Sequence, residues 1–405
     1  MNVLDRFLKY VSFDTGSDAA SKTIPSTAKQ KKLGEFLVAE MRQMGISDAH
    51  MDEFGYVYGS IPANTEKSAP KIGLIAHMDT VADVPCGDIK PRVVENYDGG
   101  DILLSAEKNI VLSPAEYPDL LKYTGGSLVV TDGTTLLGAD DKAGIAEILA
   151  AAEALLASDA PHGDVKIAFT PDEEIGRGPD KFNVPEFGAD YGYTVDGGEL
   201  GELEYENFNG ADGRVVVHGR NIHPGTAKGQ MVNALLLAME FNALLPAAQI
   251  PAHTEGYEGF FHLTDMKGDV EHAELSYIIR DHDSEKYEGK KKLFCSIGAF
   301  LNEKYGAGTF EVSTTDCYAN MKEKILPHME IISRARAAME RAGVTPKVQP
   351  IRGGTDGATL SFMGLPCPNL CTGGHNFHGR FEYIPVKSME KVVEILLHIL
   401  YGAVL

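Results

Sequence analysis

The sequence predicts an α/β fold, in which helices cover both faces of a mostly parallel sheet, with a smaller α+β domain inserted into it. Nearly continuous apolar runs, such as 71–76 and 165–169, have the pattern of buried strands, and amphipathic helical segments alternate with them. From about residue 208 the pattern changes to the alternation that is typical of half-exposed antiparallel strands.

Length and composition limit the classes of protein to consider. A chain of 405 residues is too long for one simple core, so two domains are expected. The formal net charge of -21, from 37 basic and 58 acidic residues, argues against nucleic acid or an anionic membrane as a partner, because these partners require clustered Lys and Arg. The five cysteines form no C-x-x-C pair, and their odd number argues against a disulfide framework, so we expect a reducing, cytoplasmic location.

The first part of the chain shows the alternation of helices and strands most clearly. Residues 1–11 have the spacing of an amphipathic helix and not of a signal peptide, and no apolar run is long enough to span a membrane. A Gly-, Pro- and Asp-rich segment, 84–135, is expected to form irregular loops. The other elements expected here are a helix at 29–44, strands at 56–62 and 71–76, a helix ending near 157, and strands at 165–169 and 191–195.

The predicted insertion covers residues 208–319, and residues 1–207 with 320–405 form the main domain. Within the insertion we expect strands at 214–218, 260–266, 275–279 and 309–313, and a helix at 231–245. After it, we expect a helix at 328–342, a strand at 368–372 and a helix at 387–400.

Two adjacent acids, Asp140 and Asp141, stand where an apolar segment gives way to an Ala-rich helix. Like charges this close raise each other's pKa unless a positive group lies beside them, and a divalent metal is the simplest such group. The alternative is an exposed turn with an Asp helix cap.

Other candidate ligands share one placement. His77 and Asp79 follow the run 71–76, and Glu173 and Glu174 follow 165–169. Asp196 and the pair His375 and His378 likewise come after predicted strands. In open α/β sheets the carboxyl ends of the strands form the ligand-binding edge. Taken singly, a His-x-Asp or Glu-Glu pair is more often surface polarity, so the common placement carries the argument.

These residue types favour Zn, Mn or Co, because imidazole and carboxylate ligands occur without thiolate. They exceed the three protein ligands that one catalytic zinc needs, which suggests two metals about 3.5–4 Å apart. Asp79 could accept the second imidazole N–H of His77. Of Glu173 and Glu174, one could bind metal and the other transfer a proton.

The motifs together resemble the M20 family of metallopeptidases over nearly the whole chain. They are His77-Met-Asp79-Thr80, the segment 134–147 around Asp140-Asp141, 169–176 around Glu173-Glu174, 193–198 around Asp196, His223-Pro-Gly-Thr-Ala-Lys-Gly, Tyr277-Ile-Ile-Arg280-Asp, Arg352-Gly-Gly-Thr-Asp356-Gly-Ala and Gly373-Gly-His-Asn-Phe-His378-Gly.

The resemblance implies two zinc ions, with Co²⁺ or Mn²⁺ as substitutes, bound by the domain 1–207 and 320–405. It implies the following roles: His77 and Asp196 on one ion, Glu174 and His378 on the other, Asp140 bridging, Asp79 orienting His77, and Glu173 as general base. It also implies a cis peptide between Asp140 and Asp141. The Asn-Phe-His-Gly pattern favours His378 over His375 as ligand.

The insertion would then be a lid or dimerisation domain. The resemblance implies that His223 helps to stabilise an oxyanion, and it makes Arg280, Arg352 and Asn320 candidates for binding the substrate. Without the resemblance, His223 before Pro224 has the pattern of a turn residue, and a lone Arg more often makes a surface ion pair.

The implied activity is removal of the N-terminal residue from tripeptides, by a metal-bridging water with Glu173 as general base. The alternatives are another M20 hydrolase, either a dipeptidase or an N-acyl amino-acid deacylase, and a non-catalytic metal-dependent binding protein. The implied partner is a small peptide substrate, and a homodimer is left open.

Overall fold

A computed structural model describes residues 1–404, which divide into two compact units. The first unit contains Met1–Tyr205, Glu323–Gln349 and residues from Thr355 onwards, and the second contains Glu206–Lys322 and Pro350–Gly354. The short segment Pro350–Gly354 thus groups with the second unit, although the sequence analysis assigned it to the main domain.

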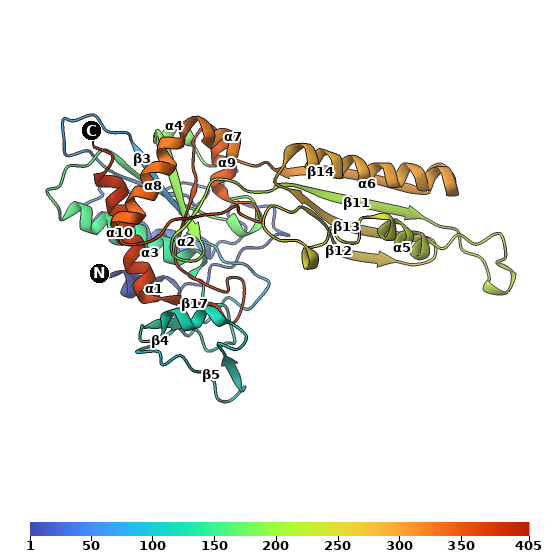
Figure 1. The fold of residues 1–405 in the computed structure, drawn as a ribbon, viewed down its shortest axis with the longest axis horizontal. Coiled ribbons are helices and arrows are strands. Elements are labelled where there is room, and N and C mark those ends of the chain that lie inside the picture. The colour runs from blue at the N-terminus through green and yellow to red at the C-terminus, as the bar shows by residue number, and fades with distance from the viewer. Residues whose placement is uncertain (405) are drawn as a thin grey trace. The chain divides into compact units, whose positions relative to one another are not determined.

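The first unit is built on an eight-stranded sheet (Figure 1). Its strands, in spatial order, are β1 (His50–Met51), β2 (Val57–Ile61), β8 (Val165–Thr170), β3 (Ile72–His77), β9 (Tyr191–Gly197), β16 (Asn369–Cys371), β10 (Glu202–Glu204) and β15 (Lys347–Val348). The central strands β8, β3, β9 and β16 are parallel, and antiparallel pairs occur toward both edges. The mostly parallel α/β fold is therefore confirmed.

Helices pack on both faces of this sheet. The helices of the unit are α1 (Val3–Tyr10), α2 (Gln30–Gln43), α3 (Ala139–Leu156), α4 (Val184–Phe187), α8 (Met329–Arg341), α9 (Asp356–Phe362) and α10 (Val386–Tyr401), and α7 (Lys322–Ile325) begins at the unit boundary. On one face, Ile75 and Ala168 pack with Phe187 of α4 and Leu360 of α9. On the other, α3 packs on β3 and β9 and is flanked by α1 and α10.

Helix α3 approaches the sheet closely because it carries glycine at the crossing. A Cβ on Gly144 would lie 2.0 Å from the carbonyl oxygen of Val195, which directly precedes Asp196. The first turn of α3 is therefore held beside the carboxyl end of β9.

The segment 84–135 is more regular than the sequence analysis expected. Strands β4 (Arg92–Val94), β7 (Leu128–Val130) and β17 (Tyr383–Pro385) form a three-stranded sheet, and β5 (Ile102–Ser105) pairs with β6 (Ile110–Leu112). They enclose a separate apolar core. Strands of three or four residues are too short to show periodicity, and β17 comes from a distant part of the chain.

The second unit is a four-stranded antiparallel sheet with helices packed on it (Figure 1). Its elements are β12 (Phe260–Gly268), β13 (His272–Asp281), β11 (Asn209–His218), β14 (Phe310–Tyr318), α5 (Ala234–Leu244) and α6 (Ser284–Tyr305). Phe241, Tyr277 and Phe294 lie in its core. The sequence analysis did not identify α6, whose first half is rich in Lys and Glu.

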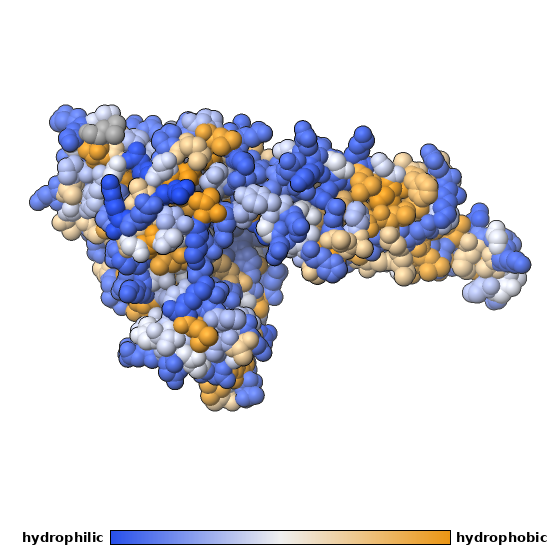
Figure 2. All heavy atoms as spheres, in the orientation of Figure 1, coloured by the Kyte–Doolittle hydropathy of each residue, from blue (hydrophilic) through white to orange (hydrophobic). Residues whose placement is uncertain are grey.

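Hydrophilic residues dominate the surface seen in Figure 2, and apolar residues gather in places on the second unit. Exposed apolar side chains of this unit include Leu236, Met239 and Phe300. Among residues 1–404, no helix is both long and apolar enough to cross a membrane.

Candidate metal centre

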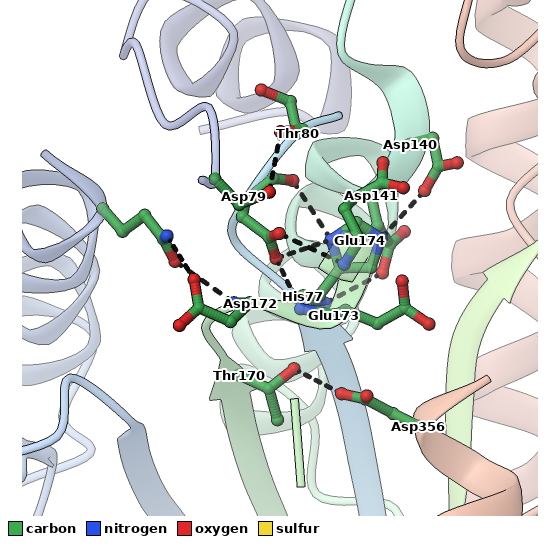
Figure 3. Close-up of polar contacts among 12 residues, drawn as sticks. His77, Asp79, Thr80, Asp140, Asp141, Thr170, Asp172, Glu173, Glu174 and Asp356 are labelled. Carbon is green, nitrogen blue, oxygen red and sulfur yellow. Dashed lines mark hydrogen bonds and ion pairs between the residues drawn. The ribbon is translucent and has the colours of Figure 1, made fainter. Parts of the chain in front are cut away.

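The predicted ligands of the first unit meet at the carboxyl edge of the parallel strands, and Figure 3 shows His77, Asp140 and Glu174 among them. His77 is the last residue of β3, and Asp196 lies near the end of β9. Glu173 and Glu174 lie in a short 3-10 helix, Glu173–Ile175, after β8. Asp140 lies at the start of α3, where Asp140 and Asp141 have non-helical φ and ψ angles. The predicted sheet places these residues together because parallel strands end at a common edge.

Asp140 lies between two histidines. Its Oδ1 is 2.8 Å from Nε2 of His77, and its Oδ2 is 3.0 Å from Nε2 of His378. His77 Nε2 is also 3.4 Å from Asp196 Oδ1, and His378 Nε2 is 3.0 Å from Glu174 Oε2. Each oxygen of Asp140 thus faces a different histidine and carboxylate pair, as a bridging ligand requires.

The donor set fits divalent cations. Ligand atoms of His77, Asp140 and Glu174 lie within 4.8 Å of one another, and so do those of His77, Glu173 and Asp196. Burial and the nearby Asp140 carboxylate raise the pKa of Glu174 to about 7, and burial raises the pKa of Asp196 to about 6. Carboxylates gathered out of water repel one another, and bound cations would offset that repulsion.

Asp79 supports both the histidine and the glutamate turn. Its carboxylate accepts the backbone N–H groups of Glu173 at 2.9 Å and Glu174 at 3.2 Å. Nδ1 of His77 lies 3.1 Å from the Asp79 carbonyl oxygen and 3.4 Å from its Oδ1. Nδ1 of His77 therefore lies nearer to the carbonyl oxygen of Asp79 than to its carboxylate, and the carboxylate also holds the turn.

Asp172 anchors the same turn from its other side, and the sequence analysis missed it. This buried residue has a φ of 60°, and its carboxylate accepts hydrogen bonds from the backbone N–H of Ser26 at 2.6 Å and from Nε2 of Gln30 at 2.7 Å. The position directly before Glu173-Glu174, in a run of three acids, was the available signal.

The Asp141 carboxylate bonds to backbone N–H groups and not to the imidazole rings. Its carboxylate accepts the N–H groups of His77 at 3.1 Å and Gly144 at 3.2 Å, which ties β3 to α3. The Asp140–Asp141 peptide is cis, as the resemblance implied.

His375 faces away from this cluster. Its Nε2 is 2.6 Å from the hydroxyl of Tyr123, and its ring stacks on Tyr383 at 4.8 Å between centroids. Burial lowers the pKa of His375 to about 4. The structure thus gives His375 a place in the small apolar core beside β17, whereas His378 faces Asp140 and Glu174.

The four substrate-binding candidates lie in the second unit. His223 is exposed and accepts the N–H of Gly225, which matches the pattern of a turn residue. The Asn320 side chain is engaged by backbone groups: Oδ1 accepts from Asn207 and Lys322, and Nδ2 donates to His282.

The two arginines differ in the hydrogen bonds that their guanidinium groups make. Arg352 donates to the backbone oxygens of Thr254, Gly256 and Glu258 and so holds that loop. Arg280 lies over the rings of Phe260 and Tyr318, and its Nη1 donates to the carbonyl oxygen of Arg352 at 3.0 Å. The described residues offer no hydrogen-bond acceptor to its buried Nε.

Comparison with known proteins identifies the class of protein that this fold and site define. The model of peptidase family M20/M25/M40 matches residues 129–402, and the chain belongs to this family. The resemblance seen in the motifs is thereby confirmed.

Particular relatives are similar over their whole length. A protein named Peptidase T from Alkaliphilus oremlandii (strain OhILAs) is 59% identical over 402 residues, which cover 98% of each chain. The Peptidase T of Halothermothrix orenii is 57% identical over 399 residues, again 98% of each chain.

Solved structures share the fold. The aminopeptidase PepT from Bacillus cereus ATCC 10987 aligns with a TM-score of 0.78 at 23% identity, and covers 99% of this chain and 98% of its own. A tripeptidase from Staphylococcus aureus subsp. aureus Mu50 aligns with a TM-score of 0.79 at 24% identity, with the same coverage.

Proposed function

We propose that this chain is a metal-dependent aminopeptidase that releases the N-terminal residue of tripeptides. The observation that carries the proposal is the 59% identity, over 98% of both chains, to a relative named Peptidase T. The cluster of imidazole and carboxylate groups at the sheet edge supports it, because peptide hydrolysis requires an activated water and a polarised carbonyl.

The proposed centre holds two zinc ions. His77 and Asp196 would bind one, Glu174 and His378 the other, and Asp140 would bridge them. The support is the contact of each Asp140 oxygen with a different histidine. When bound, such ions polarise the scissile carbonyl and lower the pKa of a coordinated water.

Glu173 is the proposed general base. Its carboxylate lies in the group with His77 and Asp196, so it is close enough to the proposed ligands to receive a proton there. A water molecule attacks the first peptide carbonyl carbon while Glu173 takes its proton. Glu173 then gives that proton to the nitrogen of the leaving amine, so that protons balance. Asp79 holds the backbone of Glu173 and orients His77.

In the second unit, His223 is proposed to stabilise the oxyanion. Arg280, Arg352 and Asn320 are the candidates to bind the C-terminal carboxylate of the substrate. The contacts favour Arg280 among them, since Arg352 already donates to three backbone oxygens and Asn320 is engaged at its oxygen and its amide nitrogen. A homodimer and a cytoplasmic location stay predictions.

A substrate panel tests the activity. Purified, metal-loaded protein is assayed on Ala-Ala-Ala, N-acetyl-Ala-Ala-Ala, Ala-Ala and Ala-Ala-Ala-Ala, with and without a chelator. We expect rapid cleavage of the free tripeptide alone, lost on chelation. Preference for the acetylated peptide would indicate a deacylase and preference for Ala-Ala a dipeptidase. No cleavage of any peptide would favour a metal-dependent binding protein.

A further inference from the structure

We propose that Glu382 is a positioning residue that holds Asp140 at the correct distance from His378. This inference rests on the metal centre of the proposed function. The Glu382 carboxylate bonds to backbone N–H groups and to neither His77 nor His378, and it belongs to none of the ligand groups above. Its effect would pass through the backbone of the segment that carries Asp140.

The contacts of Glu382 are concentrated on one short segment. Oε2 accepts the backbone N–H groups of Leu137 at 2.7 Å and Gly138 at 2.8 Å. Oε1 accepts those of Ala139 at 2.7 Å and Asp140 at 3.1 Å. Four consecutive N–H groups therefore converge on a single carboxylate, which is only 2% exposed.

The backbone is shaped for this arrangement. Gly138 has a φ of 79°, in the left-handed region that glycine adopts without strain, and it turns the chain so that successive N–H groups point inward. These four groups lie before the regular part of α3, because Asp140 and Asp141 have non-helical φ and ψ angles, so the turns of that helix give them no acceptor. The carboxylate satisfies donors that would otherwise be buried without partners.

Glu382 also links the two segments that carry ligands. It lies four residues after His378 and directly before β17, where Tyr383 pairs with Val130 of β7. The chain continues from β7 to Leu137 and Asp140. The four hydrogen bonds thus close a loop between the His378 segment and the Asp140 segment, whose side chains meet at 3.0 Å. Movement of this loop would change the distance from Asp140 to both histidines.

A purely structural role makes a different prediction. If Glu382 only stabilised the fold, its replacement would lower thermal stability and leave the affinity for metal unchanged in the folded protein. A positioning role predicts reduced affinity in a protein that still folds, because ligands held in the wrong geometry bind a cation less tightly.

The test measures zinc affinity on metal-stripped full-length protein by competition with a chromophoric chelator. Glu382→Gln keeps the size of the side chain but replaces one acceptor oxygen by an NH₂ group that faces N–H donors. We expect its zinc affinity to fall by about 10–100-fold. Glu382→Asp keeps the charge but is shorter, so we expect a smaller loss.

Glu147→Gln is the matched control. Glu147 is also a fully buried carboxyl, on α3, and neither of its oxygens has a hydrogen-bond partner among the described residues. We expect parent-like zinc affinity in this variant. Circular dichroism and thermal unfolding of the metal-free proteins identify variants that fold.

Parent-like zinc affinity in either folded Glu382 variant, or an equal loss in Glu147→Gln, would overturn the positioning role. Zinc binding by the parent protein distinguishes this outcome from failure of the proposed function. Absence of zinc binding by the parent would reject the metal centre itself, whereas tight binding by parent and Glu382→Gln alike would reject only the role of Glu382.

Discussion

Among the adjacent acidic residues in this site, some carboxylates contact the candidate metal ligands and others accept backbone N–H groups. Asp140 faces two histidines, whereas Asp141 accepts backbone N–H groups from β3 and α3. Asp172 likewise holds the turn in which Glu173 and Glu174 lie. The acids that contact the backbone restrict the orientations of those that face the proposed metals.

Replacing the proposed base tests this division at Glu173. Glu173→Ala should lower kcat by about 10²–10⁴-fold, because proton transfer is lost while the proposed ligands remain. Zinc content, measured by elemental analysis, should equal that of the parent. Loss of zinc from this variant would contradict the assignment and make Glu173 a ligand.

The two histidines of the 373–379 segment provide a second test. His378→Ala should release one of the two proposed zinc ions and abolish turnover, because it removes a contact to Asp140 and Glu174. His375→Ala should retain both ions and lower the unfolding temperature, because it removes a ring stacked on Tyr383. Zinc stoichiometry and thermal unfolding are measured on both variants. Loss of zinc from His375→Ala and not from His378→Ala would make His375 the ligand.

At the scale of elements, helix α3 determines where Asp140 can lie. The helix packs on β3 and β9, and Gly144 allows its first turns to approach the carbonyl of Val195. The carboxyl ends of β3, β8 and β9 then lie beside the start of α3. The five proposed ligands therefore come from five separate segments, the fifth being the loop after β16 that carries His378. The short strand β17 connects this arrangement to the small sheet formed with β4 and β7.

Gly144→Ala should therefore destabilise the protein by about 1–3 kcal/mol or more, because its Cβ would overlap the backbone of β9. The thermal unfolding midpoint of metal-free protein measures the effect. The control is Gly289→Ala on α6, where a Cβ would meet nothing within 4 Å. There we expect a gain of about 0.5–1 kcal/mol from helix propensity. Equal midpoints for the two variants would show that α3 tolerates a side chain at the crossing.

At the scale of the whole molecule, the candidate ligands all belong to the first unit, and the second unit has its own apolar core. Bound metal stabilises whichever unit holds it, since a ligand that binds only the folded state adds to its stability. The two units should therefore respond differently to metal.

Chelation should weaken the first unit selectively. Hydrogen exchange measured by mass spectrometry, with and without a chelator, should show faster exchange at the ends of β3, β8 and β9 and at the start of α3. Exchange in α5 and α6 should be unchanged, because neither helix contributes a proposed ligand. Faster exchange in α5 and α6 alone would show that the metal binds to the second unit, and would contradict the proposed centre.

The sequence by itself determined the α/β class and the placement of the candidate ligands after buried strands. Runs such as 71–76 and 165–169 are nearly continuously apolar because both faces of a central strand are covered, and parallel strands must end at one edge. That reasoning was sufficient to expect His77, Glu174 and Asp196 near one another.

Only the tertiary structure decided which oxygen faces which nitrogen, that His375 stacks on Tyr383, and that Glu382 gathers four N–H groups. The three-residue strands of the 84–135 segment and the lysine-rich helix α6 were also beyond the sequence analysis. The physical reason is common to these features. They depend on contacts between segments far apart in the chain, or on packing of single side chains, and local periodicity predicts neither.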